Sequence, residues 1–402
     1  MAGRKVLKIS VAALAVAVCL VLLWPAAGGA YASRKQRQVE NAWVGSFGTL
    51  QDLLKRYPKS NTNETARRLE ELVKPLGLDL TPKDREVIIH EPVSRDSESW
   101  KAVSEYLTAQ LQKPEATIDP PPQEVGRFLN AHIGGLSAIE ETLLNSPSPA
   151  WSFDPTSLPN RQVIPSVRVF LRLQRALLAE ALVQAGTDNA AAERTLEASW
   201  KLNNWLRETP DLVCQLIALA IARTQVGALR KVEVDDSVWR SRLAEHDFKR
   251  SVFDTQLLDL WPRPDRSRQL EEIEYRSERS ALKRLKSRFE EPYGNIVWSE
   301  ALEKMRLAYL RIKASPVMGK DLWDEVHGPR KNASDIIVSI QMPNMVDCFK
   351  RVDRLVIESE LTDKILEARQ LRRENNLRWP PSIFRHRSHA VSRRPVDLRR
   401  FA

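Results

Sequence analysis

The segment VRVFLRLQRALLAEALVQA, residues 167–185, decides the fold class of this chain. Its apolar residues recur every three or four positions, which is the period of an amphipathic α-helix. Arg168, Arg172 and Arg175 fall on the other face. We therefore predict a helix that buries one side in a protein core. The residues predicted to line that side are Val167, Phe170, Leu171, Leu177, Leu178, Ala181, Leu182 and Ala185.

Two further helices are predicted to follow this one directly. Gly186, Thr187 and Asp188 form a turn, and Leu196 and Trp200 then continue at helical spacing. Pro210 and Asp211 begin the next helix, residues 212–229, which is apolar on almost all sides. Polar groups at Gln215, Arg223 and Gln225 would be costly in lipid, so we expect this helix at the centre of a protein core.

The remainder of the chain after Ser33 is also predicted to be helical, because no run alternates apolar and polar residues for long. Helices are expected at about residues 97–111, 123–145, 266–289, 295–314 and 345–376. The fold class is therefore all-α. It comprises an N-terminal membrane or signal helix, followed by an irregular helical bundle or an α-solenoid of antiparallel helix pairs.

A stretch rich in proline and serine divides the predicted helices into two groups. Residues 146–165 show no helical period and are expected to form an extended linker. This predicts an N-terminal helical subdomain over residues 33–145 and a C-terminal helical subdomain over residues 166–376. Residues 377–402 form an arginine-rich tail that we expect to be disordered.

The start of the chain, residues 1–32, predicts either a signal anchor or a signal peptide. Ile9 to Trp24 is uncharged and is preceded by basic residues, as in an export signal. Its length lies between that of a signal peptide and that of a full membrane span. Pro25, Gly28 and Gly29 are expected to break the helix ahead of the small residues Ala30 and Ala32. The signal segment is then either cleaved after Ala32 or retained as an anchor.

The predicted address follows from the same segment. The leading basic residues keep the N-terminus inside, so the body lies in the periplasm or an equivalent extracytoplasmic space. If the signal is retained, the protein is a single-pass protein of the inner, cytoplasmic membrane. If the chain is cut after Ala32, it is secreted into the periplasm.

The charge of the chain is concentrated at its two ends. Residues 1–37 carry six basic side chains and no acidic one, and residues 378–402 carry seven arginines and one aspartate. The total is +10, which leaves only about −2 for the residues between. We therefore expect no basic face on the folded body, and nucleic acid is an unfavoured partner.

No group of residues in the sequence predicts a catalytic centre, a cofactor site or a metal site. The histidines lack metal-ligand spacing: His90 has no second histidine on the same helix, and His386 and His389 lie in the arginine-rich tail. Ser280 and Lys283 match an isolated Ser-x-x-Lys element without its companion motifs. Cys214 and Cys348 lie in apolar helical stretches, which favours buried free thiols over a disulfide.

Two other groups of residues have structural interpretations. Adjacent acidic pairs such as Glu140 and Glu141 face different directions on a helix, so we expect them to be solvated. We expect the tryptophans to pack in the core rather than to line a binding groove. They are Trp200, Trp205, Trp239, Trp261, Trp298 and Trp323.

Two resemblances bear on the family. The hairpin around residues 186–188, with Ala192, Leu196 and Trp200 after it, resembles one tetratricopeptide-type helix pair, but no copy recurs at a period of about 34 residues. Residues 378–383, RWPPSI, resemble a segment that ends helices in uncharacterised, signal-anchored bacterial envelope proteins. The arginine-rich tail that follows is either a basic tail for phosphate or lipid, or the out-of-frame end of a truncated gene.

These observations predict a membrane-tethered, extracytoplasmic helical scaffold that acts through protein partners in the cell envelope and is not an enzyme. The alternative is an envelope enzyme, for example a hydrolase of cell-wall polymer, whose carboxylates come together only in the fold.

Overall fold

The computed structural model describes residues 2–81, 97–113, 117–156, 165–261, 281–314 and 332–375. Within its helices, the side chains of residues 2–22, 25–26, 97, 281–291, 337 and 339–345 lie outside the described part. The chain forms two compact units. Unit 1 comprises residues 1–52 and 259–347, and unit 2 comprises residues 53–258 and 348–402.

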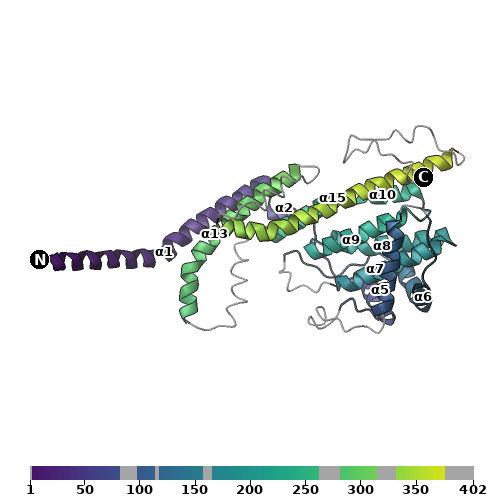
Figure 1. Cartoon of the computed structure of the whole chain (residues 1–402), viewed down its shortest axis with the longest axis horizontal. Coiled ribbons are helices and arrows are strands. Elements are labelled where there is room, and N and C mark those ends of the chain that lie inside the picture. Colours follow the sequence, from purple (N-terminus) through teal and green to yellow (C-terminus); the bar gives the residue numbers. More distant parts are fainter. Residues whose placement is uncertain are drawn as a thin grey trace. The chain divides into compact units, whose positions relative to one another are not determined.

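Three consecutive helices, α7 (Val167–Ala185), α8 (Asn189–Glu208) and α9 (Leu212–Leu229), form the centre of unit 2 (Figure 1). Asp188 and Asp211 cap the second and third of them: their carboxylates accept hydrogen bonds from the backbone N–H groups of Ala191 and Cys214. Such caps satisfy donors that a helix start leaves free. The predicted turn and both helix starts are confirmed.

Among the helices whose side chains the structure describes throughout, α9 is long and apolar enough to cross a membrane, and most of it is buried inside unit 2. The buried amide nitrogen of Gln215 on this helix bonds to protein. Gln215 Nε2 donates to the carbonyl oxygens of Leu206, Arg207 and Thr209, at 2.8 to 3.1 Å. These bonds support the predicted position of α9 in a protein core, since buried amides need hydrogen-bond partners.

A second buried network joins all three central helices. Ser199 Oγ donates to Gln174 Oε1 at 2.5 Å and accepts from Gln225 Nε2 at 2.9 Å. Asn203 Nδ2 donates to the carbonyl of Ala218 at 3.1 Å. Because polar groups pair only in one register, this network fixes α7, α8 and α9 against one another.

Helices α3 (Glu64–Leu72), α5 (Ser97–Gln112) and α6 (Gln123–Asn145) pack outside this centre, and the short 3-10 helix η1 (Lys74–Leu76) follows α3. The bounds of α6 match those predicted. Residues 150–153 pass close to the start of α3, where Ser60 and Phe153 form an isolated antiparallel bridge. Trp151 packs there against Phe170 and Trp205, with ring centres 5.4 and 5.2 Å apart.

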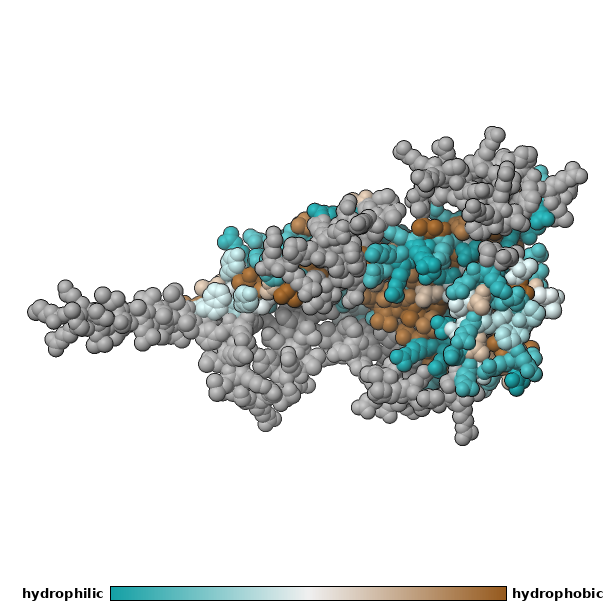
Figure 2. Space-filling view, viewed as in Figure 1, coloured by the Kyte–Doolittle hydropathy of each residue, from teal (hydrophilic) through white to brown (hydrophobic). Residues whose placement is uncertain are grey.

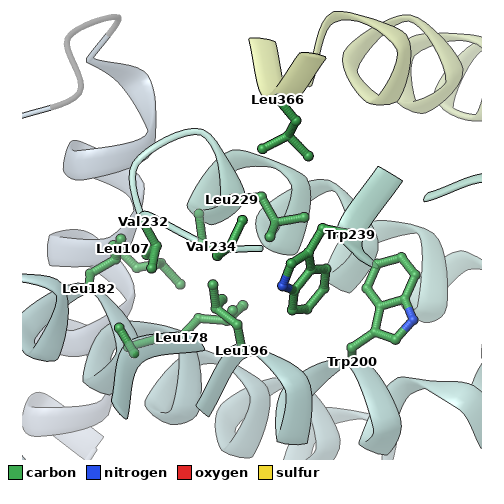
Figure 3. Close-up of a cluster of buried hydrophobic side chains, with 13 residues drawn as sticks. Leu107, Leu178, Leu182, Leu196, Trp200, Leu229, Val232, Val234, Trp239 and Leu366 are labelled. Atoms are coloured by element: carbon green, nitrogen blue, oxygen red, sulfur yellow. The ribbon is translucent and has the colours of Figure 1, made fainter. Parts of the chain in front are cut away.

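Helix α10 (Asp236–Glu245) and the second part of α15 (Ala333–Glu374) complete the main apolar core of unit 2. Figure 3 shows Leu366 of α15 directed towards Leu229 of α9, and Trp239 of α10 beside Trp200 of α8. The core is therefore built from helices that are far apart in the sequence. In Figure 2, hydrophilic residues cover much of the described surface of unit 2 in that view, with apolar residues showing between them.

Helix α11 (Phe248–Leu260) contacts the start of unit 2 through an ion pair and hydrogen bonds. Arg56, which follows α2 (Leu50–Leu54), donates two hydrogen bonds to the buried carboxylate of Asp254, at 2.8 and 3.0 Å. Tyr57 Oη donates to the same carboxylate at 3.2 Å. Burial and the charge of Asp254 together raise the pKa of Tyr57.

Unit 1 contains α1 (Ala2–Phe47) and α13 (Ala281–Ala314), which pack together in the same direction (Figure 1). Gly28 approaches Pro292, Lys35 Nζ lies 2.7 Å from Glu300 Oε1, and Trp43 packs on Tyr309. Trp43 also contacts Phe47 and Trp261 edge-on. An aromatic cluster therefore closes the pair at the end of α1.

Several predicted breaks lie inside helices instead. Pro25, Gly28 and Gly29 are all within α1, so the predicted break there is wrong. Pro292 is within α13, which joins the predicted helix at residues 295–314 to part of the one before it. The predicted helix at 345–376 begins earlier, as α15. Packing outweighs local propensity here, because the buried Pro292 fits against Gly28.

The all-α prediction is confirmed: the described residues form helices and no strand. Cys214 and Cys348 are both buried free thiols, as the sequence favours. The subdomain boundaries, with a linker at residues 146–165, stay a prediction.

Candidate functional site

A cavity of about 640 Å³ in unit 2 is lined largely by cationic side chains and by apolar ones. We call it the basic cavity. Residues of α5, α7, α9 and α15 line it, including the apolar side chains of Leu107, Leu111, Leu361 and Ile365. Its cationic lining residues are Lys113, Arg175, Arg223, Arg230, Lys231, Arg354 and Arg369, and of all the lining residues only Glu358 is acidic.

Glu358 is already shared between two of these cations. Arg223 donates to both of its oxygens, at 2.9 and 3.3 Å, and Arg354 Nε donates to Oε1 at 3.0 Å. Burial acts to raise the pKa of Glu358, but hydrogen bonds from Arg223 and Arg354 lower it overall. The carboxylate stays ionised, and five cations remain for which the lining offers no acid.

Three of those five are fixed by neutral groups of the protein. Arg369 donates to the carbonyl oxygens of Leu229, Arg230 and Val232, at the end of α9. Carbonyls at a helix C-terminus attract cations. Arg230 Nη1 donates to Thr362 Oγ1 at 3.4 Å, and Lys231, only 8% exposed, lies 3.5 Å from the carbonyl of Thr117.

A fourth cation, Lys113, pairs with Asp119 outside the lining. Arg175 of α7 is the fifth, and it makes no hydrogen bond or ion pair with any residue that the structure describes. Burial lowers the pKa of Arg175, and the charge of Arg172 lowers it further. The pKa values of Arg230 and Arg369 are also lowered, chiefly by burial. Burying these cations close together therefore costs free energy, and a bound anion would reduce that cost.

A second cavity, of about 310 Å³, lies between α8, α9, α10 and α15 of unit 2. We call it the apolar cavity, because Trp200, Val226, Leu243, Phe248 and Leu355 line most of it. The acidic lining residues are Asp247, Glu360 and Asp363. Asp363 accepts from Arg240 Nε at 2.8 Å, and this bond raises the pKa of Arg240.

His246 also lines the apolar cavity, with its Nε2 3.2 Å from Ser251 Oγ. Burial and the nearby charge of Arg207 lower the pKa of His246 to about 4. Burial likewise lowers the pKa of Arg207 to about 10, and its guanidinium lies over the ring of Trp200, 4.2 Å from the centre. A general base works best with a pKa near neutral, so this serine and histidine are poorly tuned for nucleophilic catalysis.

The residues considered as metal ligands or nucleophiles from sequence lie mostly outside the described part of the chain. This applies to His90, His386, His389 and Ser280, and to the side chain of Lys283. Within the described ranges, no three His, Cys, Asp or Glu side chains gather in a way that could hold a metal ion.

Two structural expectations are corrected in part. Glu141 is exposed as predicted, but Glu140 accepts from Thr195 Oγ1 at 2.7 Å and pairs with Arg194, because its side of α6 packs on α8. Trp298 is 38% exposed rather than buried. Trp323 lies outside the described residues, whereas the other four predicted core tryptophans are buried: Trp200, Trp205, Trp239 and Trp261.

The basic cavity was not predicted from the sequence, because the net charge of a region does not say where its charged residues lie in the fold. A middle region with a charge near zero still gathers seven cations at one place. The spacing of arginines along the sequence was a signal: Arg230, the C-cap of the mostly apolar α9, lies two turns after Arg223, and Arg172 and Arg175 share one side of α7.

Comparison of the chain with known protein families, with curated proteins and with solved structures finds no match.

Proposed function

We propose that this protein is a membrane-tethered, extracytoplasmic helical scaffold that acts by binding partners in the cell envelope. The observation that carries this proposal is the continuity of α1. One helix extends from Ala2, through the predicted anchor Ile9 to Trp24, and on to Phe47. Its second half is packed in unit 1, so the apolar segment is an extension of a folded element.

The position of Ala32 supports retention of the anchor. Ala32 is 3% exposed and lies in α1 between Gly28, which contacts Pro292, and Lys35, which pairs with Glu300. Proteases cut exposed and poorly ordered chain far more readily than packed helix. Cleavage after Ala32 would also remove the contacts of Gly28 from the folded pair.

Exposed aromatic residues beyond the apolar segment also support a membrane position. Trp24 and Tyr31 on α1, and Tyr293 and Trp298 on α13, are all exposed. Tryptophan and tyrosine are enriched where a membrane meets water, because their rings have both apolar and polar parts.

The folded part that this tether presents is an irregular bundle, in which α7, α8 and α9 form antiparallel pairs. No second hairpin of the same kind repeats in the sequence, which favours a bundle over a regular solenoid. Such a bundle offers rigid surfaces for protein partners, and crosslinking followed by pull-down from native membranes would identify them.

The topology is tested with a reporter fused after residue 40, together with the mass of the full-length protein in membrane and soluble fractions. We expect an extracytoplasmic reporter signal and an intact N-terminus in the membrane fraction. A matched variant, Ala30→Phe, removes the other small residue of the predicted cleavage site at an exposed position, and it should show the same intact N-terminus as the parent. A cytoplasmic reporter signal, or a mature chain that begins at Ser33, would contradict the tether.

An envelope enzyme acting on cell-wall polymer is the second candidate, favoured by the three carboxylates of the apolar cavity. Glu360 and Asp247 are the candidate acid and base in this cavity. Loss of cell-wall turnover in Glu360→Gln, with normal membrane level and stability, would favour this function over the scaffold.

A further inference from the structure

We propose that the basic cavity is a binding site for a ligand that carries a phosphate group with at least two negative charges, or a phosphodiester joined to an apolar body. This inference goes beyond the scaffold function and does not depend on the tether. It is argued from the charge, the fixed positions and the apolar part of the cavity.

The positive charge of the lining favours the binding of an anion. Of the seven cations, Arg223 and Arg354 share Glu358, and Lys113 pairs with Asp119. Arg175, Arg230 and Arg369 form no ion pair with a carboxylate that the structure describes, although the charge of Glu358 acts on Arg230. Cations this close repel one another, and an anion placed among them would remove that repulsion.

The cations are held in place before any ligand arrives. Three carbonyl groups at the end of α9 fix Arg369, and Thr362 contacts Arg230. A site whose groups are already ordered loses less entropy on binding. Arg175 is the exception, since it has no partner in the described structure and is available to a ligand.

The chemistry of the lining favours phosphate. Guanidinium groups donate paired hydrogen bonds that match the oxygens of a phosphate, and five of the seven cations that line the cavity are arginines. Leu107, Leu111 and Ile365 add an apolar wall. The volume of about 640 Å³ is that of a small-molecule site. A phosphate group attached to an apolar body would use both parts.

Two sources supply this chemistry: the headgroup of an anionic lipid, and a soluble phosphate compound. The test uses the full-length protein in a neutral detergent at low ionic strength. Binding of inorganic pyrophosphate and of short-chain phosphatidylglycerol is measured by calorimetry, with short-chain phosphatidylcholine as the zwitterionic control. Tighter binding of phosphatidylglycerol identifies the lipid source, and tighter binding of pyrophosphate identifies the soluble one.

The matched variants are Arg175→Gln and Arg168→Gln. Both remove one exposed arginine from α7, but only Arg175 lines the cavity. Arg175→Gln should weaken binding by about tenfold, as expected for a lost hydrogen bond to a charged group. Arg168→Gln should not, and both should keep the melting temperature of the parent.

The proposal is overturned if neither anion binds, or if the two variants weaken binding equally. These results would leave the tether untouched, because topology is measured separately. A wrong topology with intact anion binding would overturn only the scaffold function.

Discussion

At the scale of single residues, His246 is a buried base that folding keeps neutral. It lies at the edge of the apolar cavity, hydrogen-bonded to Ser251 and edge-on to Phe248. Burial and the charge of Arg207 hold its pKa at about 4, against an ordinary value of 6.5. The unfolded chain therefore binds a proton at a higher pH than the folded chain.

This difference makes stability depend on pH with a definite sign. Above pH 6.5 neither state protonates His246, and the histidine has no effect on the slope. Between pH 6.5 and about 4 the unfolded state is mostly protonated and the folded state is not, so the free energy of unfolding should fall by about 3 kcal/mol as pH falls. Urea unfolding from pH 7.5 to 4 measures this loss.

The control is His246→Gln, which cannot titrate. It should lose less stability over the same pH range than the parent, although both share the losses from carboxylates. Equal slopes in the two proteins would show that His246 is protonated normally in the folded state.

At the scale of elements, the contact between α1 and α13 depends on a glycine that the sequence marks as a helix breaker. A Cβ added at Gly28 would lie 3.1 Å from Pro292 Cβ and 3.2 Å from the ring of Trp24. A Cβ added at the neighbouring Gly29 would meet nothing within 4 Å. The two positions therefore form a matched pair.

We expect Gly28→Leu to destabilise the helix pair by about 1 to 3 kcal/mol, because the added side chain forces α1 and α13 apart. Gly29→Leu should be neutral or slightly stabilising, since leucine favours helix over glycine. Thermal unfolding followed by circular dichroism compares the two variants. A loss of equal size in both would show that helix propensity, and not this contact, controls the position.

Elements could be predicted from sequence where their signals are local. The starts of α8 and α9 were predictable, because a capping aspartate bonds to a backbone N–H only three residues away. The continuity of α1 and α13 was not, since it depends on Gly28 meeting Pro292, residues that are far apart in the chain. Local propensity cannot report such a contact.

At the scale of the whole molecule, the arginine-rich tail is predicted to be dispensable for folding. Deleting residues 382–402 should leave the melting temperature unchanged, because this segment shows no apolar period that could join a core. Differential scanning calorimetry of the full-length and shortened proteins tests this. A large drop in melting temperature would mean that the tail contributes to a folded unit.

The candidate site could not be predicted from the sequence, because it depends on how distant parts of the chain pack together. The basic cavity needs Lys113, Arg175, Arg230 and Arg369, which come from four separate parts of the chain. Their types are visible in the sequence, but their proximity results only from how the apolar faces of α5, α7, α9 and α15 pack together. A sum of charges over the chain averages this concentration away.

The continuity of α1 has a mechanical consequence if the protein is tethered as proposed. A helix of 46 residues is about 70 Å long, and it bends far less readily than a flexible linker of the same number of residues. A force applied to unit 1 would be transmitted along this strut to the anchor instead of being absorbed by slack chain. The protein would then hold the attached end of unit 1 at a set height above the bilayer and search for partners mainly by lateral diffusion.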